Sequence, residues 1–202
     1  MRLLIIRHGE SEADLLDVHE GRADFALTPK GHAQAAAMAE WVAARYAVSR
    51  LYCSPLQRAR QTAEHLARRT GLPPCLNDRL MEFNNGLIAG LDRATAAARY
   101  PEAPNLPLHA ALYEQESALD FRFRAECALS QLLSENGPNE TIAVVSHGGM
   151  ICQLYRAFLR LPADSDIFWL TGDTGVHEWT AGERDRRVVR ANSLEHLASL
   201  GA

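Results

Sequence analysis

The sequence predicts a three-layer α/β/α fold with a mainly parallel sheet, an antiparallel edge strand and a small helical lid insertion. Short aliphatic and β-branched runs alternate with longer amphipathic segments, which is the pattern of βα units. Two of these runs end in loops that contain His-Gly. At 202 residues with 47% hydrophobic content, the chain is long enough to bury one substantial core. We therefore expect a single α/β domain over residues 1–202.

The first predicted βα unit opens the chain. Residues 3–6 form an aliphatic run that ends abruptly at the charged segment 7–10, as a buried strand does where it enters a loop. Thr28 and Pro29 have the residue types of an N-cap and a first helical turn, and they predict a helix to about Tyr46. The apolar side chains of this helix fall on one face, so we expect it to cover the sheet.

Two further units repeat the pattern. Residues 51–53 predict a second strand, and residues 54–69 predict a helix that begins with a serine cap and a proline. Residues 141–145 predict a third strand, which leads through a His-Gly-Gly loop into a helix that ends near Leu161. Strands that alternate with helices in this way indicate a largely parallel sheet.

The remaining segments predict an insertion and a closing edge. Residues 85–138 contain several prolines and then a helix over 117–135, and we expect this excursion to form a lid or substrate-side region over the strand ends. Residues 175–180 and 187–190 have the composition of edge strands, and residues 193–200 predict a closing helix.

Charge and hydropathy exclude several classes of protein. The formal net charge of −4 gives no overall attraction for nucleic acid or an anionic membrane. No apolar run approaches the roughly 20 residues of a membrane span, and the opening run 3–6 is too short for a signal-peptide core. We expect a cytoplasmic protein without nucleic-acid or membrane partners, in which any anion site is local.

The predicted strand ends carry the residues that predict chemistry. Segments 7–9 and 146–149 each place a histidine followed by glycine at the carboxyl end of a parallel strand, where open α/β sheets bind ligands. The glycines, Gly148 among them, leave backbone N–H groups free to point at an anion. Arg7 and Arg58 can supply forked donors to a phosphoryl group. This combination predicts a phosphate site.

A short Arg-His-Gly motif alone carries little information, because such tripeptides arise by chance. Its position at a strand end, together with a second His-Gly loop and an arginine in the intervening unit, gives it weight. The other histidines are isolated in the sequence, and we expect surface or locally hydrogen-bonded roles for them: His19, His32, His65, His109, His177 and His196.

Longer motifs follow one another from end to end of the chain. They are Leu4-Ile5-Ile6-Arg7-His8-Gly9-Glu10-Ser11, Gly21-x-x-Asp24-x-x-Leu27-Thr28-Pro29-x-Gly31, Ser54-Pro55-Leu56-x-Arg58-Ala59-x-Gln61-Thr62-Ala63, Val145-Ser146-His147-Gly148-Gly149 and, more weakly, Leu80-Met81-Glu82. In this order and spacing the chain resembles the histidine phosphatase, or phosphoglycerate mutase-like, superfamily.

The resemblance implies a metal-independent phosphatase that hydrolyses a small phosphomonoester and needs no cofactor. It implies that His8 attacks phosphorus and becomes phosphohistidine, while Arg7, Arg58 and His147 hold the equatorial oxygens and Glu82 carries the proton. Cationic neighbours that depress the pKa of an imidazole would keep it nucleophilic, which fits this scheme. Without the resemblance, Glu82 would be interpreted as a solvated loop carboxylate.

The chain departs from the family pattern near the expected phosphate site. Relatives commonly carry an amide at the position of Asp14 and a glutamine at that of Glu20, and segment 85–90 lacks the usual tryptophan and glutamate. We expect both acids, like Gly148, to lie close to the phosphate. They would either weaken phosphate binding or recognise a cationic group on the substrate.

Several alternatives stay open from the sequence. A mutase would use the same chemistry, but we expect this chain to lack the insertion and the C-terminal tail of the longer mutases, which favours a phosphatase. A non-catalytic module that binds a phosphoryl ligand is a second alternative. A metallohydrolase built on His8, Glu10, Asp14 and His19 is a third, although these residues lack helical metal-ligand spacing. The physiological phosphoester and the oligomeric state, with a homodimer as one option, stay open too.

Overall fold

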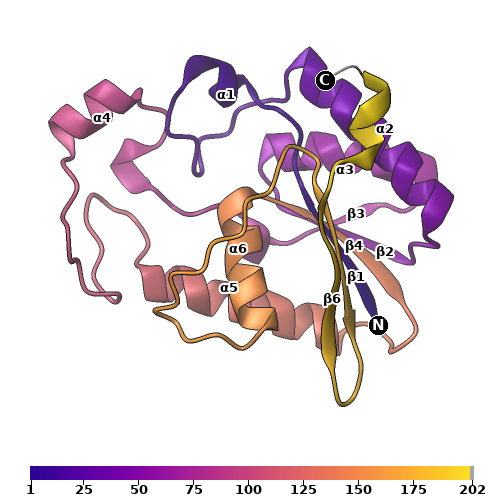
Figure 1. The fold of residues 1–202 in the computed structure, drawn as a ribbon. Coiled ribbons are helices and arrows are strands. Elements are labelled where there is room, and N and C mark those ends of the chain that lie inside the picture. The colour runs from indigo at the N-terminus through magenta and orange to yellow at the C-terminus, as the bar shows by residue number, and fades with distance from the viewer. Residues whose placement is uncertain (201–202) are drawn as a thin grey trace.

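The computed structural model describes residues 1–200, and their strands form one six-stranded sheet (Figure 1). The strands are β1 (Arg2–Arg7), β2 (Arg50–Cys53), β3 (Pro74–Leu76), β4 (Thr141–Ser146), β5 (Val176–Ala181) and β6 (Arg186–Ser193). Their order is β3-β2-β4-β1-β5-β6, in which the first four strands are parallel, β5 is antiparallel to β1, and β6 is antiparallel to β5. The predicted α/β fold with a mainly parallel sheet is confirmed.

Helices cover both faces of this sheet (Figure 1). Strand β1 shows how the layers are divided, because Leu3 and Ile5 join one buried cluster while Leu4 and Ile6 join the other. The first cluster includes side chains of α5 (Ala118–Ser134) and α6 (Gly148–Phe158), and the second includes side chains of α2 (Pro29–Arg45) and α3 (Gln57–Thr70). The alternation of side chains along the strands therefore produces the three layers.

The positions of the C-terminal strands in the sheet differ from the sequence prediction. Strand β5 was expected at an edge, but it lies inside the sheet between β1 and β6, and its residues Val176 and Trp179 are fully buried. Only β6 forms that edge of the sheet. The segment expected to close the chain as an α-helix is a 3-10 helix, η3 (Glu195–Leu200).

The start of α3 also corrects the sequence prediction. The helix begins at Gln57 with Leu56 as its N-cap, so neither Ser54 nor Pro55 has the capping role that their residue types predicted. A residue that precedes proline is disfavoured in the helical region, which keeps Ser54 outside the helix. Its hydroxyl is used elsewhere, because Ser54 Oγ lies 2.8 Å from Nε2 of His147.

The excursion over residues 85–138 contains two kinds of structure. Its small helices are η2 (Gly86–Ile88) and α4 (Arg93–Arg99), and Figure 1 shows that α4 lies away from the sheet. Helix α5, by contrast, packs on the sheet, with Phe121 and Leu129 buried in the first cluster. Two further short helices, α1 (Glu12–Leu16) and η1 (Asp78–Leu80), lead into loops beside the strand ends.

None of the helices within residues 1–200 is both long and apolar enough to cross a membrane.

Candidate active site

The two His-Gly loops meet because β1 and β4 are neighbouring parallel strands. Arg7 pairs with Ser146 in the strand register, so His8 and His147 follow the last paired residues of each strand. Their ring centroids lie 5.1 Å apart, and both side chains are buried. The structure thus brings His8 and His147, which the sequence analysis singled out, together at the carboxyl ends of β1 and β4.

The imidazole of His8 has a defined tautomer. Its Nδ1 lies 2.7 Å from the carbonyl oxygen of Gly9, and since a carbonyl only accepts, Nδ1 carries the proton. The opposite nitrogen, Nε2, is left with its lone pair and accepts a hydrogen bond from Nε of Arg58 at 3.2 Å. Burial, and then the charges of Arg58 and Arg7, hold the pKa of His8 well below its usual value. His8 is therefore a neutral imidazole with its nucleophilic nitrogen facing cationic groups.

Arg58 is fixed on α3 by its own hydrogen bonds. Its side chain is fully buried, and its two terminal nitrogens donate to the backbone oxygens of Ala23 at 3.0 Å and Gly21 at 2.8 Å. These bonds hold the guanidinium so that Nε faces His8. The loop 21–23 thus positions a cation that the sequence placed only approximately.

His147 and Arg7 each retain a buried nitrogen without a partner. Nε2 of His147 lies 2.8 Å from Ser54 Oγ, whereas Nδ1 of His147 is buried and has no hydrogen-bond partner among the described residues. Nη1 of Arg7 donates to the carbonyl oxygen of Thr171 at 2.7 Å, and Nε of Arg7 is likewise buried and unpaired. Buried polar atoms are normally hydrogen-bonded, so two such atoms beside His8 suit a ligand with several acceptor oxygens.

Glu82 follows the short helix η1 and reaches the start of α6. Its two carboxylate oxygens accept backbone hydrogen bonds, one from Phe83 at 2.8 Å and one from Gly149 at 2.9 Å. A Cβ atom at position 149 would lie 2.5 Å from Oε1 of Glu82, so a larger residue there would displace the end of the Glu82 side chain. Together with His8, Glu82 lines one small cavity.

Asp14 and Glu20, the two acids at which the sequence departs from the family pattern, have different surroundings. Glu20 lies inside the site, with Oε2 at 3.1 Å from Arg58 Nε and 3.8 Å from His8 Nε2. Asp14 is exposed, and its Oδ2 accepts from the backbone N of Ser11 at 2.8 Å at the start of α1. The structure therefore brings Glu20 to the His8 cluster and directs Asp14 to a helix cap.

The cavity at these residues has a volume of about 230 Å³. It is lined by residues of both His-Gly loops, by both glutamates and by a loop near the C-terminus: Arg7, His8, Glu20, Glu82, Gly148, Gly149, Phe168, Trp169, Leu170 and Thr171. The sequence analysis missed the segment 168–171. Its signal was an apolar run, 167–170, inside a stretch with no predicted helix or strand.

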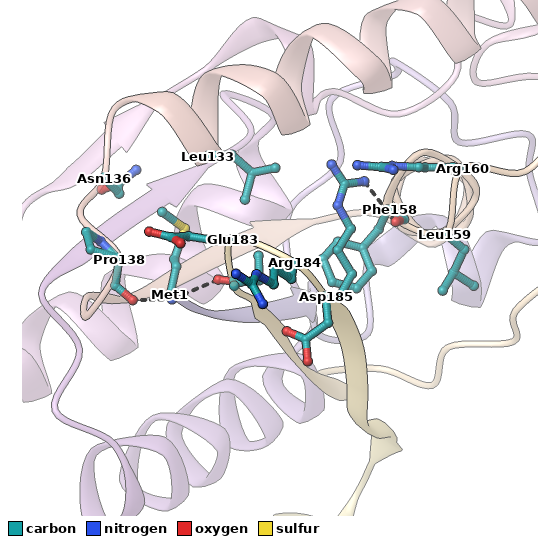
Figure 2. A pocket seen from close by; sticks show the side chains of 13 residues that line it. Met1, Leu133, Asn136, Pro138, Phe158, Leu159, Arg160, Glu183, Arg184 and Asp185 are labelled. Atoms are coloured by element: carbon teal, nitrogen blue, oxygen red, sulfur yellow. Dashed lines mark hydrogen bonds between the residues drawn. The ribbon is translucent and has the colours of Figure 1, made fainter.

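Figure 2 shows a larger cavity, of about 550 Å³, at a different place in the fold. It lies between Met1, Pro138, Phe158 and the β5–β6 turn at residues 181–186, and it shares no residue with the cavity at His8. Volume alone therefore does not locate the chemistry. Titratable groups that lie together and have strongly shifted pKa values are better indicators of an active site. His8 and His147 are such a pair, because the pKa of each is held well below its usual value.

No three His, Cys, Asp or Glu side chains are grouped as metal ligands within residues 1–200. Glu10, a residue of the metallohydrolase alternative, is paired with Lys30 at 2.7 Å and accepts from the hydroxyl of Thr28. Its neighbour in that alternative, Asp14, serves the cap of α1.

Comparison with known proteins agrees with this geometry. Residues 3–193 match the histidine phosphatase superfamily (branch 1). Glucosyl-3-phosphoglycerate phosphatase of Mycobacterium tuberculosis is 30% identical over 190 residues, which cover 89% of this chain and 83% of the relative. Phosphoserine phosphatase 1 of Hydrogenobacter thermophilus is 27% identical over 203 residues, 98% of this chain and 94% of the relative.

Solved structures show the same relationship. A complex of mycobacterial glucosyl-3-phosphoglycerate phosphatase with VO3 has a TM-score of 0.83 and 28% identity, and the match covers 95% of this chain and 99% of that chain. The α-ribazole phosphatase of Shigella flexneri has a TM-score of 0.88 and 25% identity, over 96% of this chain and 97% of that chain. The chain therefore belongs to the histidine phosphatase superfamily, as the motifs at both His-Gly loops predict, and it is a phosphatase of that superfamily.

Proposed function

We propose that His8 of this phosphatase attacks the phosphorus of a small phosphomonoester in line, through Nε2. The bond between phosphorus and the leaving oxygen breaks as the N–P bond forms, and water then hydrolyses the phosphohistidine to inorganic phosphate. The observation that carries this proposal is the tautomer of His8, whose Nε2 is unprotonated and faces Arg58. Phosphoryl transfer needs mainly positioning and charge stabilisation, which this arrangement supplies.

Three cationic or neutral donors would hold the equatorial oxygens. Nε of Arg58 lies 3.2 Å from the attacking nitrogen, and the ring of His147 lies 5.1 Å from that of His8. Nε of Arg7 and Nδ1 of His147 are buried without a partner among the described residues. Ser54 Oγ accepts from the backbone N of Leu56 at 3.3 Å, so its proton is free to bond Nε2 of His147 and leave Nδ1–H as the donor. Gly148 begins α6, whose positive end adds to the field at the phosphoryl group.

Glu82 would move the proton. It would protonate the departing alkoxide and then accept a proton from the attacking water, as a general acid and base. Its place in the same cavity as His8 supports this role. Each of its oxygens accepts one backbone hydrogen bond, and a second lone pair on either oxygen can carry the proton that is shared with the leaving oxygen.

The surroundings of the site support a small substrate. A cavity of about 230 Å³ has room for a phosphoryl group and a short leaving group. The segment 85–138 would act as a substrate-side lid within a single domain 1–202, and within this segment α4 lies away from the sheet. We place the enzyme in the cytoplasm, acting on free small molecules rather than on nucleic acid or membranes.

The test is a phosphoenzyme trap with a radiolabelled phosphoester. We expect a label on the protein that is lost in acid and survives base, as an N-linked phosphate should, and His8→Ala should abolish it. His109→Ala, at an exposed histidine outside the site, is the control and should label normally. Label on serine or aspartate, or normal turnover by His8→Ala, would contradict the proposal. Loss of wild-type activity with a chelator would support the metallohydrolase instead.

A further inference from the structure

A carboxylate of the protein itself lies where a phosphoryl oxygen would bind. In a productive complex the attacking nitrogen and the phosphorus are about 3–3.5 Å apart. Oε2 of Glu20 is 3.8 Å from Nε2 of His8 and 3.1 Å from Nε of Arg58, so it lies inside the volume of such a phosphoryl group. It contacts the same two groups that would bind the substrate. Glu20 in this position and a bound phosphoryl group therefore exclude each other.

The charges around Glu20 determine what happens when an anion enters. Arg58 from α3 and Arg7 from the end of β1 attract the carboxylate, whereas Asp14 from α1 repels it. His8 is neutral at ordinary pH, and Glu82 lines the same cavity. A tetrahedral dianion would compete for both arginines and would place two further negative charges beside the carboxylate.

The hydrogen bonds at Ser11 suit a protonated Glu20. Ser11 Oγ lies 2.5 Å from Oε1 of Glu20 and 3.0 Å from Oδ2 of Asp14. One hydroxyl proton cannot serve both carboxylates, but a protonated Glu20 can donate to Ser11 while Ser11 donates to Asp14. Burial raises the pKa of Glu20, against the opposing effects of Arg58 and Ser11. Burial therefore favours the protonated form of Glu20 more than in a solvent-exposed glutamate.

We propose that Glu20 is a built-in competitor for the phosphate position, and that it takes up one proton when a phosphoryl group or another tetrahedral dianion binds. The neutral acid can then donate a hydrogen bond to an oxygen of that anion instead of repelling it. This inference rests on the proposed function only in placing the phosphate site at His8. Anion affinity and kcat/KM should consequently fall as pH rises above the pKa of Glu20.

Sulfate is a suitable probe, because it stays a dianion from pH 5 to pH 8 and does not react. We would measure its Kd by calorimetry across this range. For the wild type we expect Kd to rise about tenfold per pH unit above the pKa of Glu20, since one proton is taken up with each anion. In Glu20→Gln, Kd should be nearly independent of pH and at least about tenfold lower than the wild-type value at pH 8.

Two further variants separate titration from net charge and from folding. Glu12→Gln removes the same charge from the exposed start of α1 and should retain the wild-type pH slope. Glu20→Asp retains a titratable carboxyl in the same loop and should retain a slope that Glu20→Gln loses. Titrations in two buffers of different ionisation enthalpy should show proton uptake by the wild type and none by Glu20→Gln.

An unchanged pH slope of sulfate binding in Glu20→Gln would overturn this inference, and so would an equal loss of slope in Glu12→Gln. Either result would leave phosphohistidine formation on His8 untouched. Conversely, if no phosphohistidine forms but sulfate binding shows the Glu20-dependent proton uptake, the proposed function fails and the competitor role stands.

Discussion

Glu20 and Glu82 line the same small cavity, yet their partners differ in kind. Glu82 is held by two backbone N–H groups, which are neutral and fixed by the fold. Glu20 is held by the guanidinium of Arg58 and the hydroxyl of Ser11, both of which a substrate or a proton can replace. The role of each carboxyl group is therefore set by how permanent its hydrogen-bond partners are and not by residue type.

The origins of the two side chains explain this difference. Glu82 is tied to the first turn of α6, so its position depends on a packed helix next to β4. Glu20 stands in a loop that follows the five-residue helix α1, and loops tolerate movement more readily than packed elements. A proton carrier needs a fixed position, whereas a side chain that competes with the substrate must be able to move out of the phosphate position.

The largest expected effect tests the task of Glu82. We expect Glu82→Gln to lower kcat/KM for an alkyl phosphate by about 10²–10⁴-fold, because the departing alkoxide needs a proton in the transition state. An aryl phosphate with a good leaving group should slow by less than about tenfold, since it leaves without a proton. Steady-state kinetics on both substrates give the contrast, with Glu12→Gln as the charge-matched control. If both substrates slow equally, another residue carries the proton and the comparison with Glu20 fails.

The position of Glu82 can also be changed through its neighbour Gly149, without altering either acid, and we expect a smaller effect. In Gly149→Ala, the new Cβ would lie 2.5 Å from Oε1 of Glu82, the end of a flexible side chain, so Glu82 must move while the fold remains. We expect a loss of about tenfold in kcat/KM for the alkyl phosphate and little change for the aryl phosphate.

Gly137→Ala is the matched control for this experiment, since the nearest atom to its new Cβ is 3.7 Å away, on the side chain of Glu140. Thermal unfolding should show that both alanine variants are folded. An unchanged rate for the alkyl phosphate in Gly149→Ala would show that a displaced Glu82 still delivers its proton.

The central part of the site was predictable from the sequence for a local reason. The runs 3–6 and 141–145 are apolar and β-branched, and a histidine follows each of them. The carboxyl ends of parallel strands lie at the same edge of a sheet, so a shared site was predictable, whereas the direct pairing of β1 with β4 was not. Family resemblance added Glu82, whose loop carries no such local signal.

Other features depend on contacts that no local pattern encodes. Arg7 is held by Thr171, a residue 164 positions away in the chain, and the apolar loop 168–171 reaches the site only through the fold. Strand β3 was missed because it has three residues, begins with proline and is largely exposed. For Asp14 a local signal existed, since Ser11-x-x-Asp14 has the spacing of a capping box, but the sequence analysis favoured a role at the phosphate.

The smallest expected effect concerns Asp14, the acid that the sequence placed beside the phosphate. A carboxylate about 6 Å from the phosphoryl group, with its charge partly screened by salt, would predict a gain of about tenfold in kcat/KM for Asp14→Asn. Its carboxylate is instead exposed and bonded to the backbone of Ser11 at 2.8 Å, so solvent screens most of its charge. We therefore expect kcat/KM for an aryl phosphate to rise less than about threefold, and the cap of α1 to lose at most about 1 kcal/mol. Kinetics at pH 6 and pH 8, together with urea unfolding, measure both quantities.

A gain of tenfold or more would mean that Asp14 turns toward the site, and a loss confined to an amino-bearing phosphoester would identify it as a cation-recognising residue. Either outcome would mean that Asp14, like Glu20 and Glu82, acts on the substrate at this site.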